Sequence, residues 1–193
     1  MKRLIGQSIK SIMFIAIMVL IPCVCNAVEI NGVKFEKEVV VKGVDLKLNG
    51  VSVLKWAMLF DVYAGGFYLP AEVDGQQWEF DVPKKLELSY FRKIEAEGFA
   101  KASDKLLRQN LTQAEYLELS KRLNTFYSLF QDVVPGDRYS IVYIPEYGTE
   151  LRLNDEALGH VPGHDFAVAY FGIWLGGQPI NEKFRDQLLQ GNI

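Results

Sequence analysis

The chain has 193 residues, of which 49% are apolar and 12% aromatic, so it is long enough for one domain with a sizeable core. Its 21 basic and 24 acidic residues give a net charge of −3 at pH 7. A modestly acidic chain without a basic run argues against nucleic acid or anionic lipid as a partner.

The first 27 residues have the pattern of a cleavable export signal. Lys2, Arg3 and Lys10 form a positive start, and residues 11–24 are almost entirely apolar. The triplet at residues 25–27 then places small residues at the −3 and −1 positions of a signal-peptidase site. We predict cleavage after Ala27, a single domain over residues 28–193 and a periplasmic location in a Gram-negative envelope.

Two other interpretations of the amino terminus fit the sequence less well. A transmembrane anchor needs roughly 20 apolar residues, and this run is shorter. A lipoprotein needs a small residue before the modified cysteine, but Pro22 precedes Cys23 and Val24 precedes Cys25. With the signal removed, we expect no stable membrane insertion.

Both cysteines leave with the predicted signal. The mature chain then forms no disulfide and has no thiol nucleophile or thiolate metal ligand, so its core alone must stabilise it. Loss of three basic residues leaves 18 basic against 24 acidic residues, a net charge of −6.

The first third of the mature chain has strand patterns. Residues 39–41 lead through a Lys42-Gly43 turn to an alternating segment with Leu46 and Leu48, and Asn49-Gly50 predicts a second turn. Residues 54–69 are nearly all apolar or aromatic and predict one long central strand, bent at Gly65-Gly66. Residues 72–83 are polar and predict a loop, and residues 86–91 alternate as a further strand.

The middle of the chain predicts two helices. Phe99, Ala102, Leu106 and Leu107 share one helical face. Residues 112–115 fit a capping box, and apolar residues then recur at three- and four-residue steps, so the second helix should run to about Asp132.

The last third returns to strands and ends in helices. Strands are predicted at residues 139–144 and around Leu151 and Leu153. Asp165 is a candidate cap for a helix that ends at Gly176-Gly177, and Asn181 for a short final helix. This order predicts an α+β fold: an open antiparallel sheet covered by a layer of helices.

The motifs of several enzyme classes are missing. The sequence has no phosphate loop, no Gly-x-Gly-x-x-Gly and no nucleophile elbow. His160 and His164 have a spacing that could suit a metal, but Pro162 and Gly163 separate them and only Asp165 offers a third ligand. We therefore expect no metal site and no cofactor.

Three charged residues are candidates for a catalytic or ligand-binding role, and each also has a purely structural explanation. Asp61 lies inside the apolar strand, where burial would raise its pKa and make it a candidate base. The favoured interpretation is structural: it lies on the wetter face or pairs with a neighbouring lysine. Arg92 and Lys93 end a strand and could bind a carboxylate, although an exposed strand end near solvated acids is commoner.

Aromatic density is the most informative feature. Eight aromatic residues lie on elements that should pack together: Tyr63, Phe67, Tyr68, Tyr90, Phe126, Tyr127, Phe171 and Trp174. Buried phenols need hydrogen-bond partners, and an apolar cleft with a few phenols suits a flat or elongated apolar ligand. An ordinary aromatic core is the alternative.

An ordered set of segments resembles a known family. Leu48-Asn49-Gly50, residues 62–70 and residues 86–92 resemble the bacterial chalcone isomerase-like proteins. Residues 134–137 and 176–188 resemble the matching parts of plant chalcone isomerases. The resemblance implies an open antiparallel sheet with a helical layer. It also implies either cofactor-free cyclisation of chalcones or, as in plastid relatives, fatty-acid binding.

The resemblance places the functional arginine of the family on Leu54, with Lys55 beside it. Two threonines of the plant site fall on Tyr63 and Ile173. Cyclisation develops negative charge on a substrate oxygen, which a preorganised cation stabilises by several kcal/mol and a leucine does not. The resemblance therefore favours loss of the isomerase activity.

Three functional hypotheses remain. The first is a non-catalytic binder of an apolar, aromatic or fatty-acid-like molecule, with ligand contacts predicted at Tyr63, Tyr68, Tyr90, Tyr127, Ile173 and Trp174. The second is an isomerase or lyase that uses Lys55, Tyr63 or Arg92 in place of the missing arginine. The third is a structural or partner-binding protein of the envelope, whose protein partners the sequence does not identify.

Overall fold

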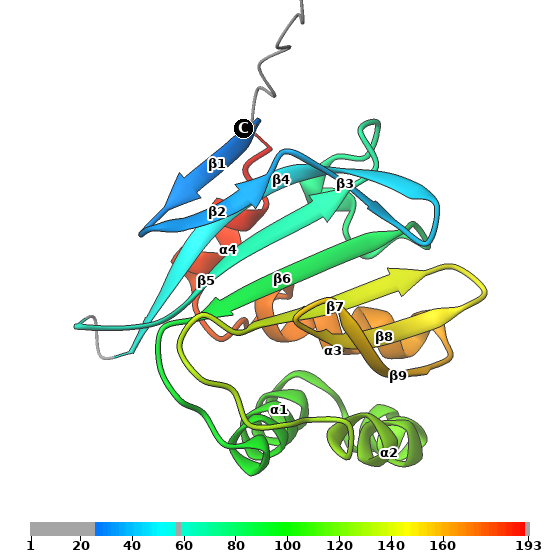
Figure 1. Cartoon of the computed structure of the whole chain (residues 1–193). Coiled ribbons are helices and arrows are strands. Elements are labelled where there is room, and N and C mark those ends of the chain that lie inside the picture. The colour runs from blue at the N-terminus through cyan, green and yellow to red at the C-terminus, as the bar shows by residue number, and fades with distance from the viewer. Residues whose placement is uncertain (1–25, 57–58, 192–193) are drawn as a thin grey trace, which may run out of the picture.

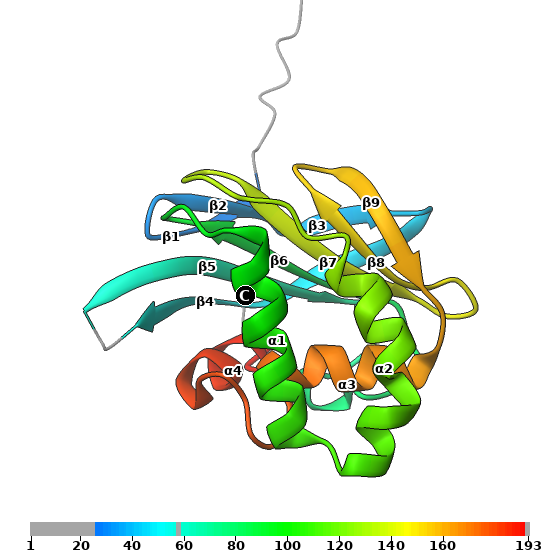
Figure 2. The ribbon, with the colours of Figure 1, turned by 90° about the horizontal axis from the view of Figure 1, so that it is seen from below.

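A seven-stranded antiparallel sheet forms the frame of the molecule (Figure 1). The computed structural model describes residues 26–56 and 59–191. The α-helices all lie against one face of the sheet, and a separate two-stranded hairpin lies against the other (Figure 2). The predicted α+β fold with a helical layer is therefore confirmed.

The sheet keeps the order of the sequence from edge to edge, so each strand pairs with the next by a simple antiparallel connection. Its strands are β3 (Glu38–Val41), β4 (Val44–Trp56), β5 (Phe60–Leu69), β6 (Lys84–Tyr90), β7 (Arg138–Ile144), β8 (Gly148–Leu153) and β9 (Glu156–Val161). The hairpin consists of β1 (Ala27–Ile30) and β2 (Val33–Glu36). The helices are α1 (Ala96–Asn110), α2 (Gln113–Tyr127), α3 (His164–Leu175) and α4 (Glu182–Leu188), with a 3-10 turn η1 at Gly75–Gln77.

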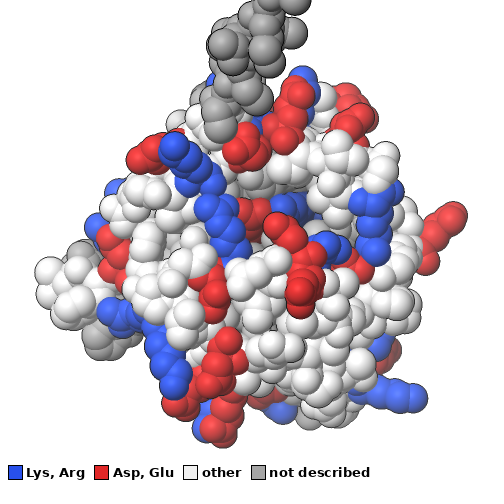
Figure 3. All heavy atoms as spheres, in the orientation of Figure 1, with Lys and Arg blue, Asp and Glu red and all other residues white. Residues whose placement is uncertain are grey.

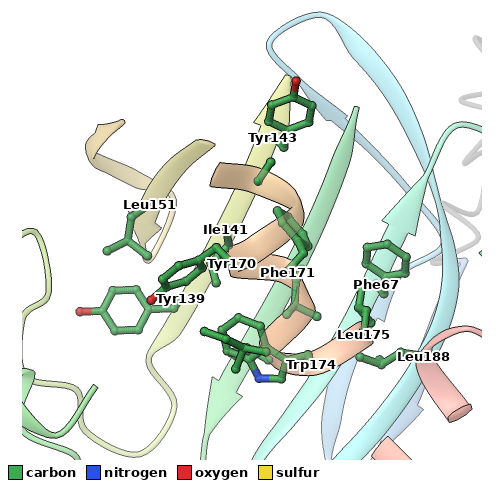
Figure 4. Packing of buried hydrophobic residues seen from close by; sticks show 14 of the residues in the cluster. Phe67, Tyr139, Ile141, Tyr143, Leu151, Tyr170, Phe171, Trp174, Leu175 and Leu188 are labelled. Atoms are coloured by element: carbon green, nitrogen blue, oxygen red, sulfur yellow. The ribbon is translucent and has the colours of Figure 1, made fainter. Parts of the chain in front are cut away.

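The two faces of the sheet bury two separate cores. The larger core lies between the sheet and the helices, where Tyr170 and Phe171 of α3 lie among residues from the strands, such as Phe67 and Tyr139 (Figure 4). The smaller core lies under the β1–β2 hairpin and contains Phe35 and Tyr68. Each fully buried aromatic or aliphatic side chain stabilises the fold by about 1.5–3 kcal/mol.

Strand β5 supplies residues to both cores because successive side chains of a strand point to opposite faces. Tyr63 and Phe67 face the helices, whereas Ala64 and Tyr68 face the hairpin. The glycines between them give both layers room: a Cβ on Gly65 would lie 2.5 Å from Phe184 Cζ, and one on Gly66 would lie 2.6 Å from Phe35 Cδ1.

Two predicted helix starts are confirmed. Thr112 and Glu115 form the capping box of α2, and the Asn181 side chain accepts a hydrogen bond from the Phe184 amide at the start of α4. The expected cap of α3 is wrong, because Gly163 occupies that position. Asp165 lies in the first turn and instead accepts from Arg122 Nη1 at 2.7 Å.

Three further expectations are corrected. Residues 54–69 do not form one strand bent at glycine, because β4 runs to Trp56 and β5 begins at Phe60. Asn49-Gly50 is not a turn but an irregularity in the pairing of β4 with β5. Helix α2 ends at Tyr127 rather than near Asp132, since Phe130 leaves the helix to stack on Phe99 at a centroid distance of 5.3 Å.

Residues 1–25, with both cysteines and most of the predicted signal, lie outside the described part of the chain. Strand β1 begins at the predicted cleavage point, Ala27. Within the described residues, no helix combines the length and apolar character needed to cross a membrane.

Candidate functional site

A cavity of about 310 Å³ lies between the sheet and helices α1 and α3. Most of its walls are apolar. Strands β4, β5 and β6, helices α1 and α3, and the segments that precede α1 and α4 contribute its lining: Leu54, Lys55, Val62, Tyr63, Tyr90, Ile94, Gly98, Phe99, Ala102, Ser103, Leu106, Ile173, Trp174, Ile180 and Asn181. We call this cavity the inner pocket.

Hydroxyl groups provide most of the polar character of the inner pocket. The indole Nε1 of Trp174 donates to Tyr63 Oη at 2.9 Å, so Tyr63 accepts and its own hydroxyl hydrogen has no acceptor among the described residues. Tyr90 is 3% exposed, and its hydroxyl has no hydrogen-bond partner in the same part of the chain. Ser103, by contrast, is paired with Tyr170 Oη at 3.0 Å.

Both phenols of this wall are neutral donors at physiological pH. Burial raises the pKa of Tyr63, and burial together with the neighbouring phenols raises the pKa of Tyr90 well above its ordinary value. Neither can act as a base near neutrality. Each can donate a hydrogen bond to an acceptor atom of a ligand.

Lys55 is the one charged residue among the described residues that line the inner pocket, and it stands at the mouth. Its side chain is 54% exposed, and Nζ lies 3.0 Å from Asp61 Oδ1. This contact, followed by a hydrogen bond from Asn31, lowers the pKa of Asp61. Asp61 is therefore an ion-pair partner, which is one of the two structural roles predicted for it, and not a buried base.

Leu54 is 7% exposed and forms part of the pocket wall. The strand register shifts between Leu54 and Lys55, but the lysine still turns to Asp61 at the surface. The position to which the resemblance assigned an arginine thus presents an uncharged side chain to the cavity.

The structure brings four of the six predicted ligand contacts into this wall: Tyr63, Tyr90, Ile173 and Trp174. Tyr68 is not among them, because it lies an odd number of residues from Tyr63 on β5 and so faces the opposite side of the sheet. Tyr127, on α2, does not line the cavity; its buried hydroxyl lacks a hydrogen-bond partner among the described residues.

The remaining catalytic candidate, Arg92, is also outside the inner pocket. It is exposed after the end of β6, with its guanidinium carbon 5.8 Å from the centroid of the Phe60 ring. Of the three candidates Lys55, Tyr63 and Arg92, only the neutral Tyr63 is buried in the wall.

The outer wall of the inner pocket was not predicted. It comes from α1, where Gly98 and Ala102 are small residues one turn apart and Phe99 and Leu106 flank them. Small residues at i and i+4 were the available sign that this helix leaves space beside it.

The two histidines do not form a metal site with each other. His164 contacts the Glu79 carbonyl oxygen at 2.8 Å, while His160 stacks on Tyr147 with ring centroids 4.4 Å apart. No group of three or more metal-ligating residues occurs within residues 26–56 and 59–191.

Comparison with known proteins gives a family and a fold. A family model described as chalcone isomerase-like matches residues 27–190. The structure is similar to that of the fatty-acid binding protein AtFAP1 of Arabidopsis thaliana, with a TM-score of 0.67 and 17% identity, covering 84% of this chain and 95% of that one. No curated protein matches the sequence.

Proposed function

The chain belongs to the chalcone isomerase-like family, and from this premise we propose that it is a non-catalytic binder of an apolar or aromatic, fatty-acid-like small molecule. The ligand would occupy the inner pocket. One observation carries the proposal: an apolar cavity of about 310 Å³ has buried phenol donors on its wall and no cation in its interior among the described residues.

The lining defines the chemistry of the ligand. Phe99, Leu106 and Ile173 provide apolar surface, and burial of apolar ligand area against them contributes about 25 cal/mol per Å². The hydroxyls of Tyr63 and Tyr90 would donate to one acceptor atom, such as a carbonyl or carboxyl oxygen. A long or flat hydrocarbon body with one oxygen-bearing end fits both features.

The same lining argues against the isomerase alternative. Chalcone cyclisation needs a cation beside the developing oxyanion, and Leu54 occupies the position that the resemblance gives to arginine. Lys55 is engaged with Asp61 at the surface. Tyr63 is a neutral phenol, which stabilises an anion far less than a guanidinium does.

Export is part of the proposal. The sequence pattern of residues 1–27 supports a signal peptide, and the match to the family model begins at residue 27, where the signal would end. We therefore propose a periplasmic carrier or sensor of an apolar molecule.

The test is to purify the mature protein without detergent, extract bound molecules into organic solvent and identify them by mass spectrometry. We expect an apolar molecule near one equivalent. Ala102→Trp places an indole at the mouth of the inner pocket and should abolish recovery of the bound molecule. Lys101→Trp, at the preceding exposed residue of α1 and outside the lining, should leave the recovery unchanged.

The proposal fails if neither decanoate nor chalcone, added to the extracted wild-type protein, binds in a saturable way. It also fails if chalcone absorbance decays faster with wild-type protein than with Ala102→Trp, because turnover in the inner pocket would then be established.

A further inference from the structure

A second hollow, of about 630 Å³, lies on the face of the sheet opposite to the helices. Figure 3 shows basic and acidic side chains gathered around it at the centre of that face. Strands β5 to β8 provide its floor, and β2 and β3 its walls; its polar lining includes Lys42, Tyr68, Lys85, Glu87, Arg138 and Arg152. We call it the outer hollow.

The pairing of the strands explains why these residues meet. Tyr68 pairs with Lys85, Lys85 with Val142, and Val142 with Glu150, so these four side chains form one row across the floor. Ser140, a small residue, separates Glu87 from Arg152 in the adjoining row.

Two carboxylates are each held between two cations: Glu87, which lines the outer hollow, and Glu150, which pairs with the lining residue Val142. Glu87 contacts Lys85 at 2.5 Å and also contacts Arg138. Burial tends to raise the pKa of Glu87, but these two cations outweigh it and hold the pKa below its ordinary value, so the carboxylate is charged. One negative charge thus faces two positive charges.

The second cluster repeats the arrangement. Glu150 is 2% exposed and lies 2.8 Å from Lys42 Nζ and 2.7 Å from Arg152 Nη1. Among the residues that line the outer hollow, the lysines and arginines therefore outnumber the acidic residues. This holds when Lys34, Glu36 and Asp155, which complete the charged lining, are included. This excess contrasts with the acidic balance of the whole chain.

Tyr68 is the feature that ion pairing alone does not explain. It is 1% exposed, it lines the outer hollow, and its hydroxyl has no hydrogen-bond partner among the described residues. The Oη atom of Tyr68 is not among the fully buried side-chain atoms that lack a partner in this part of the chain, so it reaches the space of the outer hollow and can donate a hydrogen bond there. Lys85 Nζ lies 5.5 Å from the centroid of the Tyr68 ring and carries three hydrogens, of which the contact with Glu87 uses one.

From this geometry we infer that the outer hollow binds a small carboxylate, whose oxygens accept hydrogen bonds from Tyr68 Oη and Lys85 Nζ. Valines 39–41 of β3, together with Val142, line the rest of the hollow and would contact the carbon skeleton. The site lies on the other side of the sheet from the inner pocket, so it is independent of the ligand proposed there.

The test is a heteronuclear NMR titration of the mature protein with succinate, with succinamide as the neutral analogue of the same shape. We expect saturable shifts at Tyr68, Lys85 and Arg152 with succinate, which weaken strongly when NaCl rises from 20 to 500 mM. Succinamide should cause no saturable shift.

A matched pair of variants assigns the site. Tyr68→Phe should weaken succinate binding about tenfold, the loss of one hydrogen bond to a charged acceptor. Tyr116→Phe, the same change on α2 and outside both the outer hollow and the inner pocket, should not alter it. The inference is overturned by the absence of saturable shifts with succinate, by equal binding of succinamide, or by unchanged affinity in a folded Tyr68→Phe protein.

Discussion

Adjacent lysines on β6 face opposite environments, and this difference predicts opposite effects of one substitution. Lys84 points toward the helices, is fully buried, and donates to the Phe80 carbonyl oxygen at 2.7 Å. Lys85 points into the outer hollow and pairs with Glu87 at 2.5 Å. We expect Lys84→Met to stabilise the protein at pH 7 and Lys85→Met to destabilise it.

The magnitude follows from the pKa of Lys84, which burial lowers from 10.5 to about 8, with Asp81 opposing the change. A difference of about 2.5 pKa units corresponds to about 3 kcal/mol. Because the folded protein binds the proton less tightly than the unfolded chain, this penalty is present in full below pH 8. It is relieved as the pH rises from 8 toward 10.5. Subtracting about 1 kcal/mol for the lost hydrogen bond leaves a net gain of about 2 kcal/mol at pH 7.

Urea unfolding of wild type and both variants at pH 6.5, 8 and 9.5 measures these changes. The advantage of Lys84→Met should shrink toward pH 9.5 as wild type gains stability. Lys85→Met should lose roughly 3 kcal/mol, because it leaves Glu87 with one cation fewer in a buried site. A Lys84→Met protein that is less stable than wild type at every pH, with no dependence on pH, would refute the reasoning.

Three more predictions test other parts of the account. Leu54→Arg should place a guanidinium in the inner pocket, and calorimetry should then show that the variant binds decanoate at least tenfold more tightly than decanamide, its neutral amide. Equal affinities of the variant for decanoate and decanamide would contradict the assigned position of that side chain. Gly65→Ala should lower the unfolding free energy by about 1–3 kcal/mol because its Cβ meets Phe184, whereas Gly177→Ala, with open space around it, should stay within about 0.5 kcal/mol. Intact-mass analysis of the protein secreted to the periplasm should give a chain beginning at Val28, and an unprocessed amino terminus would contradict the predicted signal.

The sequence predicted elements well where local chemistry specifies them. The capping box at Thr112 and the alternation along β6 and β7 located those elements. The end of β4 at Trp56 and the start of β5 at Phe60 were not predicted, because the sequence between them contains no glycine, proline or asparagine. Gly65-Gly66 instead suggested a bend that the structure does not have. Those glycines are required by Phe184 and Phe35, which are distant in sequence.

For the candidate sites too, local sequence patterns located some residues, whereas features that depend on contacts between distant segments were not predicted. Tyr63 and Trp174 were predicted to be near each other, and they are hydrogen-bonded. Period-two alternation would have separated Tyr68 from Tyr63, but the assumed bend at the glycines concealed this. The outer hollow depends on which strands are neighbours and on the cover provided by β2 and β3, and no local pattern contains that information.

The indole Nε1–H resonance of Trp174 offers the most direct report on whether the inner pocket holds a ligand. This group donates to Tyr63 Oη in the wall of the cavity, while Trp78 does not line it and provides an internal reference. During titration of the extracted protein with decanoate, the Trp174 indole signal should shift to saturation at one equivalent while that of Trp78 stays in place. A Trp174 signal that does not move at saturating decanoate would contradict the proposal that the inner pocket is a ligand site.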